Sequence, residues 1–161
     1  MCFVLDINSF HIFFDPSHKK YEEFSPLYDW LHDRNRKTCL VIGGEKYLDE
    51  LGKIPKYNKY LIELKNIRKL VKIDGKIVDS KAAQLKELEP GNNFDDSHIV
   101  ALLSVSGCII FASFDVRADR FISRKDFYPK KQKRPKIYRN ARHQKTLLKD
   151  ENIVELRNVI P

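Results

Sequence analysis

Short apolar runs separated by polar turns indicate where the strands of this chain lie. Residues 2–6, 38–42 and 108–112 contain nearly continuous apolar runs, a pattern typical of strands that are buried on both faces of a sheet. The segments between these runs carry apolar residues three and four positions apart, as in helices that pack on a sheet. This alternation of strand and helix predicts an α/β fold of three layers with a mainly parallel central sheet.

The same pattern of apolar and polar residues predicts the helices and the remaining turns. Helices are expected over residues 8–14, 24–36, 45–51, 57–70, 80–89, 95–105, 117–122 and 143–148. Ser25-Pro26 is a suitable helix start, and Asp79 or Ser80 is expected to cap the helix at 80–89. Asp74-Gly75 predicts a hairpin within residues 71–78. Residues 153–159 alternate weakly and are expected to form a final strand or a docked tail.

The charge of the chain is unevenly distributed. Its 161 residues suggest one domain, with a core over residues 1–127 and a basic C-terminal arm and tail, residues 128–161, that belong to the same domain. Between residues 117 and 149, thirteen Lys or Arg face two Asp, whereas the rest of the chain carries more acids than bases. Such asymmetry predicts a polyanionic partner, most simply nucleic acid. An acidic partner protein and a solvated tail without a partner are the alternatives.

Composition also excludes some classes of protein. No apolar run approaches the roughly 18 residues of a membrane helix, and the N-terminal residues lack the features of a signal peptide, so no membrane partner is expected. Cys2, Cys39 and Cys108 are scattered and odd in number, which argues against a disulfide framework or a zinc site. Three separate buried thiols in a reducing compartment are expected instead, which favours the cytoplasm.

Acidic residues follow the predicted strands. Asp6 ends the first strand, Glu45 follows the second, and Asp115 follows the strand at 108–112. Asp95 and Asp96 are expected in the first turn of the helix that precedes that last strand. In a parallel sheet, residues that follow the strands share one edge, where carboxylates repel each other unless a cation neutralises them. Oxygen ligands suit Mg²⁺ or Mn²⁺, ions that activate water and polarise phosphodiesters.

Four short motifs, in this order along residues 2–122, resemble those of PIN domains, a family of metal-dependent nucleases. The motifs are Asp6-Ile7-Asn8-Ser9 after the first strand, Glu45 after the second, Asp96 in DDSHIVALL, and Ser113-Phe114-Asp115 after CIIFA. The resemblance implies a Rossmann-like α/β/α sandwich with an acidic site for Mg²⁺ or Mn²⁺. It also implies hydrolysis of single-stranded RNA or, in some members, of structured DNA.

The resemblance also suggests a role for each acidic residue. It implies that Asp6, Glu45, Asp96 and Asp115 are the catalytic metal ligands, direct or through water, and that Asn8 and Ser113 orient them from outside. Asp95 and Asp119 are further candidates for this supporting role. The second acid usually lies among apolar helix residues, so Asp49 or Glu50 could replace Glu45.

The basic arm is the predicted nucleic-acid-binding segment. Its candidate contacts are Lys130, Lys131, Lys133, Arg134, Lys136, Tyr138, Arg139 and Arg142. Cations would contact phosphates, and Tyr128 and Tyr138 would stack under bases, as on a single-strand platform.

The sequence therefore predicts a metal-dependent endonuclease that prefers single-stranded RNA, with DNA as the other substrate class. A role as a toxin or in defence, an inhibitor or complex partner protein, and a homodimer are consistent with the family. The alternative is an inactive nucleic-acid-binding or scaffold module with the same fold. A haloacid-dehalogenase-type phosphatase needs a second Asp at position 8, where this chain has Asn8. No Ser-His or Cys-His pair is indicated, and His98 is the histidine expected nearest the acids.

Overall fold

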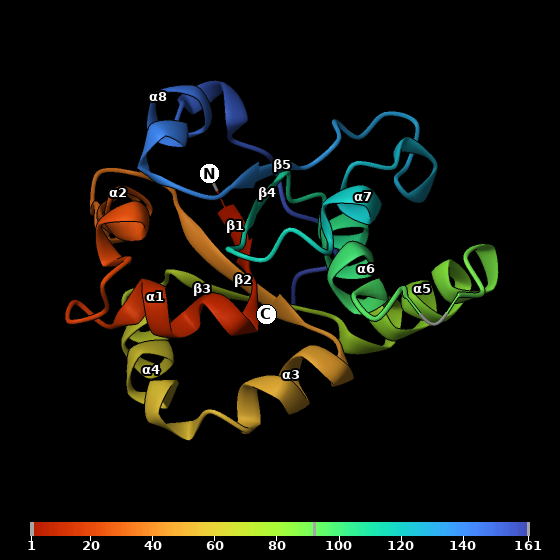
Figure 1. Cartoon of the computed structure of the whole chain (residues 1–161), viewed down its shortest axis with the longest axis horizontal. Helices are drawn as coiled ribbons and strands as arrows, with labels where there is room; N and C mark the ends of the chain where they lie inside the picture. The colour runs from red at the N-terminus through yellow and green to blue at the C-terminus, as the bar shows by residue number, and fades with distance from the viewer. Residues whose placement is uncertain (1, 92, 161) are drawn as a thin grey trace.

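One parallel β-sheet forms the centre of the molecule. The computed structural model describes residues 2–91 and 93–160. Over these residues, five parallel strands pair in the order β3-β2-β1-β4-β5 (Figure 1). The strands are β1 (Cys2–Leu5), β2 (Cys39–Gly43), β3 (Leu70–Ile73), β4 (Ile110–Ala112) and β5 (Lys136–Tyr138). The predicted α/β fold with a parallel sheet is confirmed.

Helices cover both faces of this sheet. Figure 1 shows α1, α2 and α4 on one side and α5, α6 and α7 on the other. The helices are α1 (Phe10–Phe14), α2 (Tyr21–His32), α3 (Glu45–Gly52), α4 (Asn58–Asn66), α5 (Gly75–Leu88), α6 (Ser97–Ser106), α7 (Asp119–Ile122) and α8 (Gln144–Leu147). Single 3₁₀ turns lie at Ile7–Ser9, Pro55–Tyr57, Lys125–Phe127, Ala141–His143 and Asp150–Asn152. Among the described residues, no helix has the length and apolarity needed to cross a membrane.

Helix α6 is the most deeply buried helix of the fold. Every residue from Ser97 to Ser106 is buried, as expected for a helix that is apolar on all sides. It packs along α5 and approaches both β1 and β3. Gly107 ends it in the left-handed conformation at φ 77°. The packing of α6 fixes its N-terminus, and with it the position of Asp96.

The strand order creates a switch point between β1 and β4. The chain adds β2 and β3 on one side of β1 and then crosses to add β4 and β5 on the other. Ligands of open α/β sheets bind beyond the carboxyl ends of the strands at such a point. Asp6 leaves β1 there and donates its backbone N–H to Ala112 O at 2.9 Å, which joins the two strand ends.

Several predicted boundaries differ from the structure. Asp74-Gly75 does not form a hairpin, because Asp74 caps α5 by accepting a hydrogen bond from Lys76 N at 2.9 Å. The helix predicted at 80–89 therefore begins at Gly75, without a cap at Asp79 or Ser80. Helix α2 begins at Tyr21 and contains Pro26 in its interior. The helix predicted over 57–70 runs from Asn58 to Asn66, and Leu70, its predicted last residue, begins β3.

The basic segment is not simply an exposed arm. Residues 136–138 pair with β4 and form the fifth strand. Tyr138 is 0% exposed and Tyr128 is 6% exposed, so neither ring is free to stack on a base as predicted. The aromatic residues of this segment contribute to the core, whereas most of its cations face solvent.

Cys2 and Cys39 form a disulfide, contrary to the prediction of three separate thiols. They are register partners on the neighbouring strands β1 and β2, and their Cα atoms lie 4.5 Å apart, within the range that a disulfide spans. The sequence could not indicate this pairing, because 37 residues separate the two cysteines and only the strand register brings them together. Cys108 is a free, buried thiol. The expectation of a reducing compartment was based on three free thiols, and only Cys108 is one.

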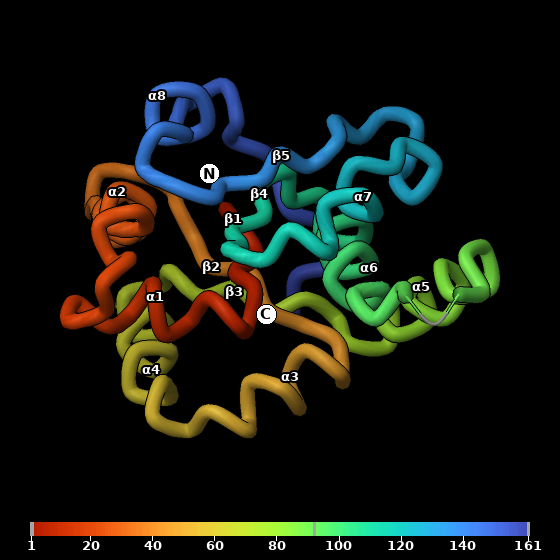
Figure 2. The backbone as a smooth tube through the Cα atoms, viewed as in Figure 1, coloured from red at the N-terminus to blue at the C-terminus, as the bar shows by residue number. Residues whose placement is uncertain are grey.

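The C-terminal residues form the predicted docked tail. Arg157 N donates to Ser106 O, and Ile160 N donates to Lys72 O, each at 2.9 Å. Val159 makes an isolated antiparallel bridge with Ile73. Figure 2 shows the end of the chain returning to the middle of the molecule, which ties the last residues to the edge of the sheet at β3.

Gly44 should not tolerate a side chain. Its φ is +84°, and an added Cβ would lie 2.7 Å from Val78 Cγ1. We expect Gly44→Ala to lower the free energy of unfolding by about 2 kcal/mol or more, measured by chemical denaturation. Gly52→Ala is the matched control, because a Cβ there meets nothing within 4 Å. Equal stability of the two variants would contradict the close approach of β2 and α5.

Candidate acidic site

Asp6 is the centre of the candidate site. Its half-buried side chain caps the 3₁₀ turn that follows β1, because Oδ1 accepts a hydrogen bond from Asn8 N at 3.1 Å. Its other oxygen, Oδ2, accepts a hydrogen bond from Ser113 Oγ at 2.6 Å. Two of the four predicted supporting residues therefore contact Asp6, Ser113 through its hydroxyl and Asn8 through its backbone.

Two serines hold the loops after β1 and β4 against each other. Ser113 Oγ also accepts from Asp115 N at 3.0 Å, so one hydroxyl orients both Asp6 and the turn that carries Asp115. Ser9 Oγ accepts from Phe114 N at 3.0 Å. Ser9 and Ser113 are fully buried, which makes these contacts part of the core.

Asp115 is engaged by an arginine. Arg117 donates from Nε and Nη2 to the Asp115 carboxylate, with Nε at 2.8 Å from Oδ2. The guanidinium, followed by the Arg117 backbone N–H, lowers the pKa of Asp115. The Arg117 side chain is 81% exposed, so little packing holds it in this pose. No sequence pattern indicated Arg117, because only the fold of this loop pairs it with Asp115.

Asp96 lies at the N-terminus of α6, as its N-cap residue. It makes no side-chain capping hydrogen bond. Asp95 and Asp96 precede the first turn of α6 and do not form part of it, contrary to the prediction. Burial raises the pKa of Asp96, and the negative charge of Asp6 raises it further, while Lys46 opposes the shift. The Asp96 carboxylate therefore accepts no capping hydrogen bond from the helix, and its charge interacts with that of Asp6.

The carboxylates form an electrostatic group, which we call the acidic site: Asp6, Asp96, Asp115 and Glu50. Burial is the main cause that raises the pKa of Asp6, and the charges of Asp115 and Glu50 add to it. The hydrogen bonds from Ser113 and Asn8 oppose this shift. The charged forms of Asp6 and Asp96 therefore destabilise the site. Carboxylates in this situation attract a cation that neutralises them.

Glu50, and not the predicted Glu45, is among the charges that raise the pKa of Asp6. Glu45 is exposed at the start of α3, where its backbone N–H donates to Asp79 Oδ1 at 2.8 Å. Glu50 raises the pKa values of both Asp6 and Tyr47, whereas Glu45 is not among the charges that act on either. Tyr47 is buried on α3 and donates to Leu5 O at 2.6 Å, which anchors this helix to the end of β1. Asp49, the other alternative, is exposed.

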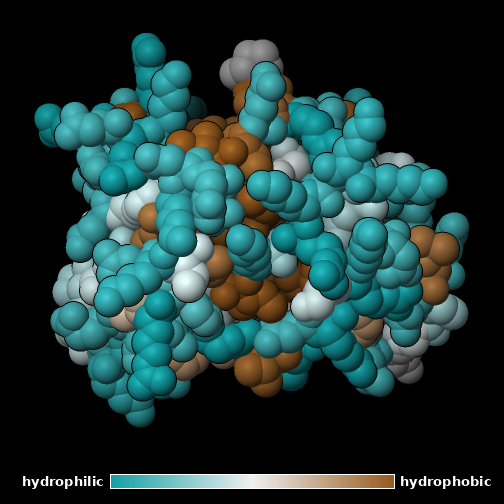
Figure 3. Space-filling view, turned by 90° about the horizontal axis from the view of Figure 1, so that it is seen from above, coloured by the Kyte–Doolittle hydropathy of each residue, from teal (hydrophilic) through white to brown (hydrophobic). Residues whose placement is uncertain are grey.

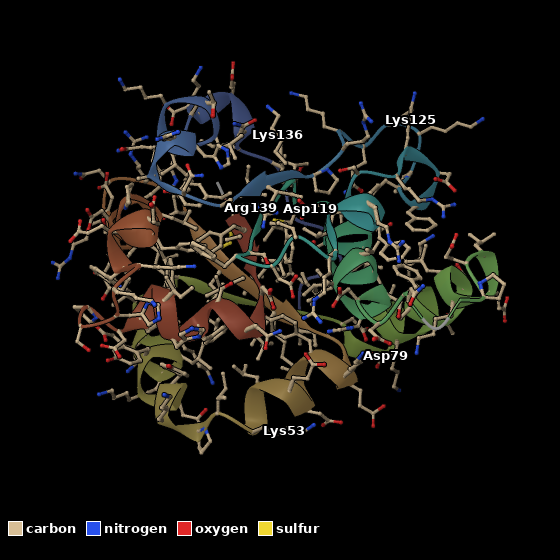
Figure 4. The ribbon with its side chains drawn as sticks, in the orientation of Figure 1. Lys53, Asp79, Asp119, Lys125, Lys136 and Arg139 are labelled. Atoms are coloured by element: carbon tan, nitrogen blue, oxygen red, sulfur yellow. A yellow bond between two sulfur atoms is a disulfide. The ribbon has the colours of Figure 1, made fainter. Side chains whose placement is uncertain are left out.

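An open cleft lies beside the acidic site. Its volume is about 610 Å³, and it is lined by Asn93, Asp95, Asp96, Val116, Arg117, Asp119 and Arg120. Asp119 forms an ion pair with Arg139 at 2.5 Å, and Figure 4 shows the two side chains next to each other. The cleft thus brings two arginines of the loop after β4 and of α7 close to Asp96.

Most cations of the basic segment lie at the other end of the sheet. Lys136 begins β5, and its N–H donates to Ile109 O at the amino end of β4. Lys131 and Lys133 line a groove with Gly107, Ile109 and Ile153, which is also on that side. Figure 4 places Lys125 and Lys136 above the Arg139–Asp119 pair. Figure 3, from above, shows an apolar area amid the hydrophilic surface of that face.

Among the predicted nucleic-acid contacts, Arg139 and Arg142 alone follow β5 at its carboxyl end. Arg139 lies in the ion pair with Asp119, and Arg142 is exposed. Lys130 and Arg134 are exposed before β5. The chain brings the predicted cations to two different edges of the sheet.

The donor set suits a hard divalent cation, because it consists of carboxylate oxygens, and burial and neighbouring acids raise the pKa values of Asp6 and Asp96. Within residues 2–91 and 93–160, no three His, Cys, Asp or Glu side chains converge on one metal position. Arg117 is one reason why the carboxylates do not converge, since it binds the Asp115 carboxylate. A full set of carboxylate ligands would require Asp115 to leave Arg117.

His98 is a further polar side chain next to these acids. It is 4% exposed in α6, and its Nε2 lies 3.4 Å from Glu50 Oε2. Burial, followed by the charge of Lys46, lowers the pKa of His98 to about 4. The spacing of Tyr47 and Glu50 on one helix could have indicated Glu50, but only the packing of α3 on α6 places it beside His98.

Asp6→Asn should stabilise the protein when divalent ions are absent. The raised pKa of Asp6 means that its charged form opposes folding, so stability is lost as pH rises from the unfolded value of 3.8 through the folded value. We expect Asp6→Asn to raise the free energy of unfolding at pH 7 by about 1 kcal/mol in chelator, roughly 2–4 °C in melting temperature.

This gain should vanish below about pH 3.8, where Asp6 is protonated in both the folded and the unfolded state. Exposed Asp29→Asn is the matched control and should change the melting temperature little. A less stable Asp6→Asn variant at pH 7 would contradict electrostatic repulsion in the acidic site.

Comparisons of the chain with protein-family models, with curated proteins and with solved structures found no match. The resemblance to PIN domains therefore stays a prediction that rests on the four sequence motifs. What the structure adds is their arrangement, with Asp6 and Asp115 at the switch point of a parallel sheet and Asp96 at the N-terminus of the buried helix α6.

Proposed function

We propose that this protein is a metal-dependent endonuclease that cleaves single-stranded RNA, with DNA as the other candidate substrate. The observation that carries the proposal is the acidic site at the switch point, where Ser113 holds Asp6 and where Asp6, Asp96, Asp115 and Glu50 act on one another. The raised pKa values of Asp6 and Asp96 show that their charged forms are costly for the fold, and such groups are concentrated at functional sites.

The chain's own residues would prepare this site for a cation. Asp6 is the fixed ligand, because Ser113 and Asn8 restrain both of its oxygens. Asp96 has no capping hydrogen bond to lose, so its carboxylate is available. Glu50 takes the place of the second acid in this proposal, and Glu45 is the alternative. Mg²⁺ or Mn²⁺ bound there would neutralise the carboxylates, activate water and polarise a phosphodiester.

Arg117 gives the site two states. With Asp115 in its ion pair, the carboxylate is neutralised without a metal. Once Asp115 turns to a cation, the exposed guanidinium would be free to contact a phosphate, for which its planar fork is suited. Arg120 lines the same cleft and would contact the neighbouring phosphate. Lys130, Lys131, Lys133 and Arg134 would then meet a longer strand outside the cleft.

The biological role is proposed from the resemblance alone. A toxin or a defence protein of the cytoplasm would need restraint, and the positive charge of +8 suits an acidic inhibitor or complex partner. A homodimer is consistent with the same family.

The alternative is an inactive nucleic-acid-binding module with this fold. Two observations favour it: Arg117 occupies Asp115, and no three acidic or histidine side chains converge within the described part of the chain. Such a module would bind RNA through the same arginines without cleaving it.

A cleavage assay separates these two functions. We expect Mn²⁺ or Mg²⁺ to support cleavage of single-stranded RNA, and EDTA to stop it. Asp6→Asn should reduce the rate about 100-fold or more, since the cation supplies several kcal/mol to the transition state. Glu50→Gln should reduce the rate more than Glu45→Gln does.

Each outcome of this assay bears on one hypothesis. Cleavage that survives both EDTA and Asp6→Asn would come from a contaminant or another mechanism and would overturn the proposal. Tight, salt-sensitive RNA binding without cleavage under any of these metals would establish the inactive module. Asp29→Asn, exposed on α2, serves as the control for purification and folding.

RNA binding should depend on the cleft more than on the basic segment. We expect the double variant Arg117→Ala, Arg120→Ala to weaken the binding of a short RNA and to reduce the salt slope by about 1 to 2, as for lost phosphate contacts. The variant with Lys130, Lys131, Lys133 and Arg134 all changed to Ala should affect only longer RNA. The opposite ranking for short RNA would show that the basic segment is the main binding surface.

A further inference from the structure

His98 is unusual among the residues of α6. Its neighbours Ile99 and Val100 are buried apolar residues, and His98 itself is 4% exposed. A buried imidazole normally satisfies both ring nitrogens. In the described part of the chain, His98 Nε2 is one of the buried polar atoms without a hydrogen-bond partner. The ring therefore presents an unexplained nitrogen in the interior, beside the acidic site.

The contacts of the ring define its tautomer. His98 Nδ1 lies 3.2 Å from the backbone oxygen of Asp95. A carbonyl oxygen only accepts, so Nδ1 donates a hydrogen bond to Asp95 O in the tautomer that carries its proton on Nδ1. In the neutral ring, Nε2 then has a lone pair and no hydrogen.

This lone pair faces another acceptor. Nε2 lies 3.4 Å from Glu50 Oε2. Two acceptors cannot form a hydrogen bond with each other, whereas a proton or a metal cation between them would satisfy both atoms. An ion about 2.1 Å from each atom would separate its two ligands by about 3.0–3.4 Å, for angles between octahedral and tetrahedral. The observed distance fits this geometry without rearrangement.

We propose that His98 Nε2 and Glu50 Oε2 are two ligands of a divalent transition metal ion of the Mn²⁺, Co²⁺ or Zn²⁺ class. A mixed nitrogen and oxygen pair selects such ions over Mg²⁺, which prefers oxygen alone. The hydrogen bond from Nδ1 to Asp95 O is the contact that orients metal-binding histidines. Water, or a phosphate oxygen of the substrate, would complete the coordination.

Lys46 approaches the other oxygen of Glu50. Lys46 Nζ lies 4.0 Å from Glu50 Oε1, the other carboxylate oxygen, and donates to Asp95 O at 2.6 Å. Oε2 remains directed at His98. The biological role of this metal site rests on the proposed nuclease function. The site would bind its metal ion at the same edge of the sheet as the acidic site.

The test uses the full chain, stripped of metal by a chelator, with Co²⁺ and Zn²⁺ as probes. We expect one Co²⁺ per chain, visible in the absorbance of its d–d bands, that an equal concentration of Mg²⁺ does not displace. In long-range ¹H–¹⁵N spectra, Zn²⁺ should shift Nε2 of His98 while Nδ1 keeps its proton.

Two variants and two controls identify the ligands. His98→Gln and Glu50→Gln should each weaken Co²⁺ binding about ten-fold or more. His11→Gln changes an exposed histidine that contacts His18, and Glu63→Gln changes an exposed carboxylate on α4. Both controls should retain the Co²⁺ affinity of the unaltered protein. If His98→Gln fails to fold, Glu50→Gln and the spectra of the unaltered protein decide.

Three results would overturn the site. These are Co²⁺ binding unchanged in Glu50→Gln, loss of binding in His11→Gln instead, and a proton on Nε2 that Zn²⁺ does not displace, which would show a proton shared with Glu50. Cleavage with Mg²⁺ alone, together with any of these, would leave the nuclease standing without this metal site. A bound Co²⁺ on His98 without any cleavage would leave the site standing and remove the nuclease.

Discussion

The contact between Ser113 Oγ and Asp6 Oδ2 is the interaction on which the candidate site depends. It joins the ends of β1 and β4 at the one place where the strand order reverses. A carboxylate at the end of a buried strand is costly unless its oxygens are hydrogen-bonded. Ser113 satisfies one oxygen and at the same time orients the turn that carries Asp115. The position of one hydroxyl therefore decides how two of the four acids lie.

Electrostatic repulsion is the second constraint. Asp6 and Asp96 have raised pKa values because burial and neighbouring carboxylates both oppose their charged forms. Asp115 is the exception, since Arg117 neutralises it. The site thus combines Asp6 and Asp96, whose pKa values are raised, with Asp115, which Arg117 neutralises, and Glu50, which lies 4.0 Å from Lys46 Nζ. This difference explains how the fold can remain stable while it keeps several carboxylates at one edge, and it makes Arg117 central to both proposed functions.

Local pattern misled where tertiary contacts decide the outcome. Asp74-Gly75 is a strong hairpin signal, but Asp74 caps α5 because β3 must connect to a helix on the far face of the sheet. The composition of residues 128–142 suggested an exposed arm, yet Tyr138 supplies a core ring from an edge strand with charged neighbours. The high density of charged residues therefore predicted the exposed side of this segment correctly, but it gave no indication that Tyr138 is buried.

The sequence by itself determined the α/β class, the buried strands at 2–5 and 39–42, the buried helix α6 and the placement of Asp6 and Asp115 after strands. These features follow from local periodicity and from the fact that parallel strands end at one edge. Only the tertiary structure decided which acid of α3 approaches Asp6, that His98 faces Glu50, and that Cys2 pairs with Cys39. The physical reason is that such pairs depend on strand register and helix packing, which connect residues far apart in the chain.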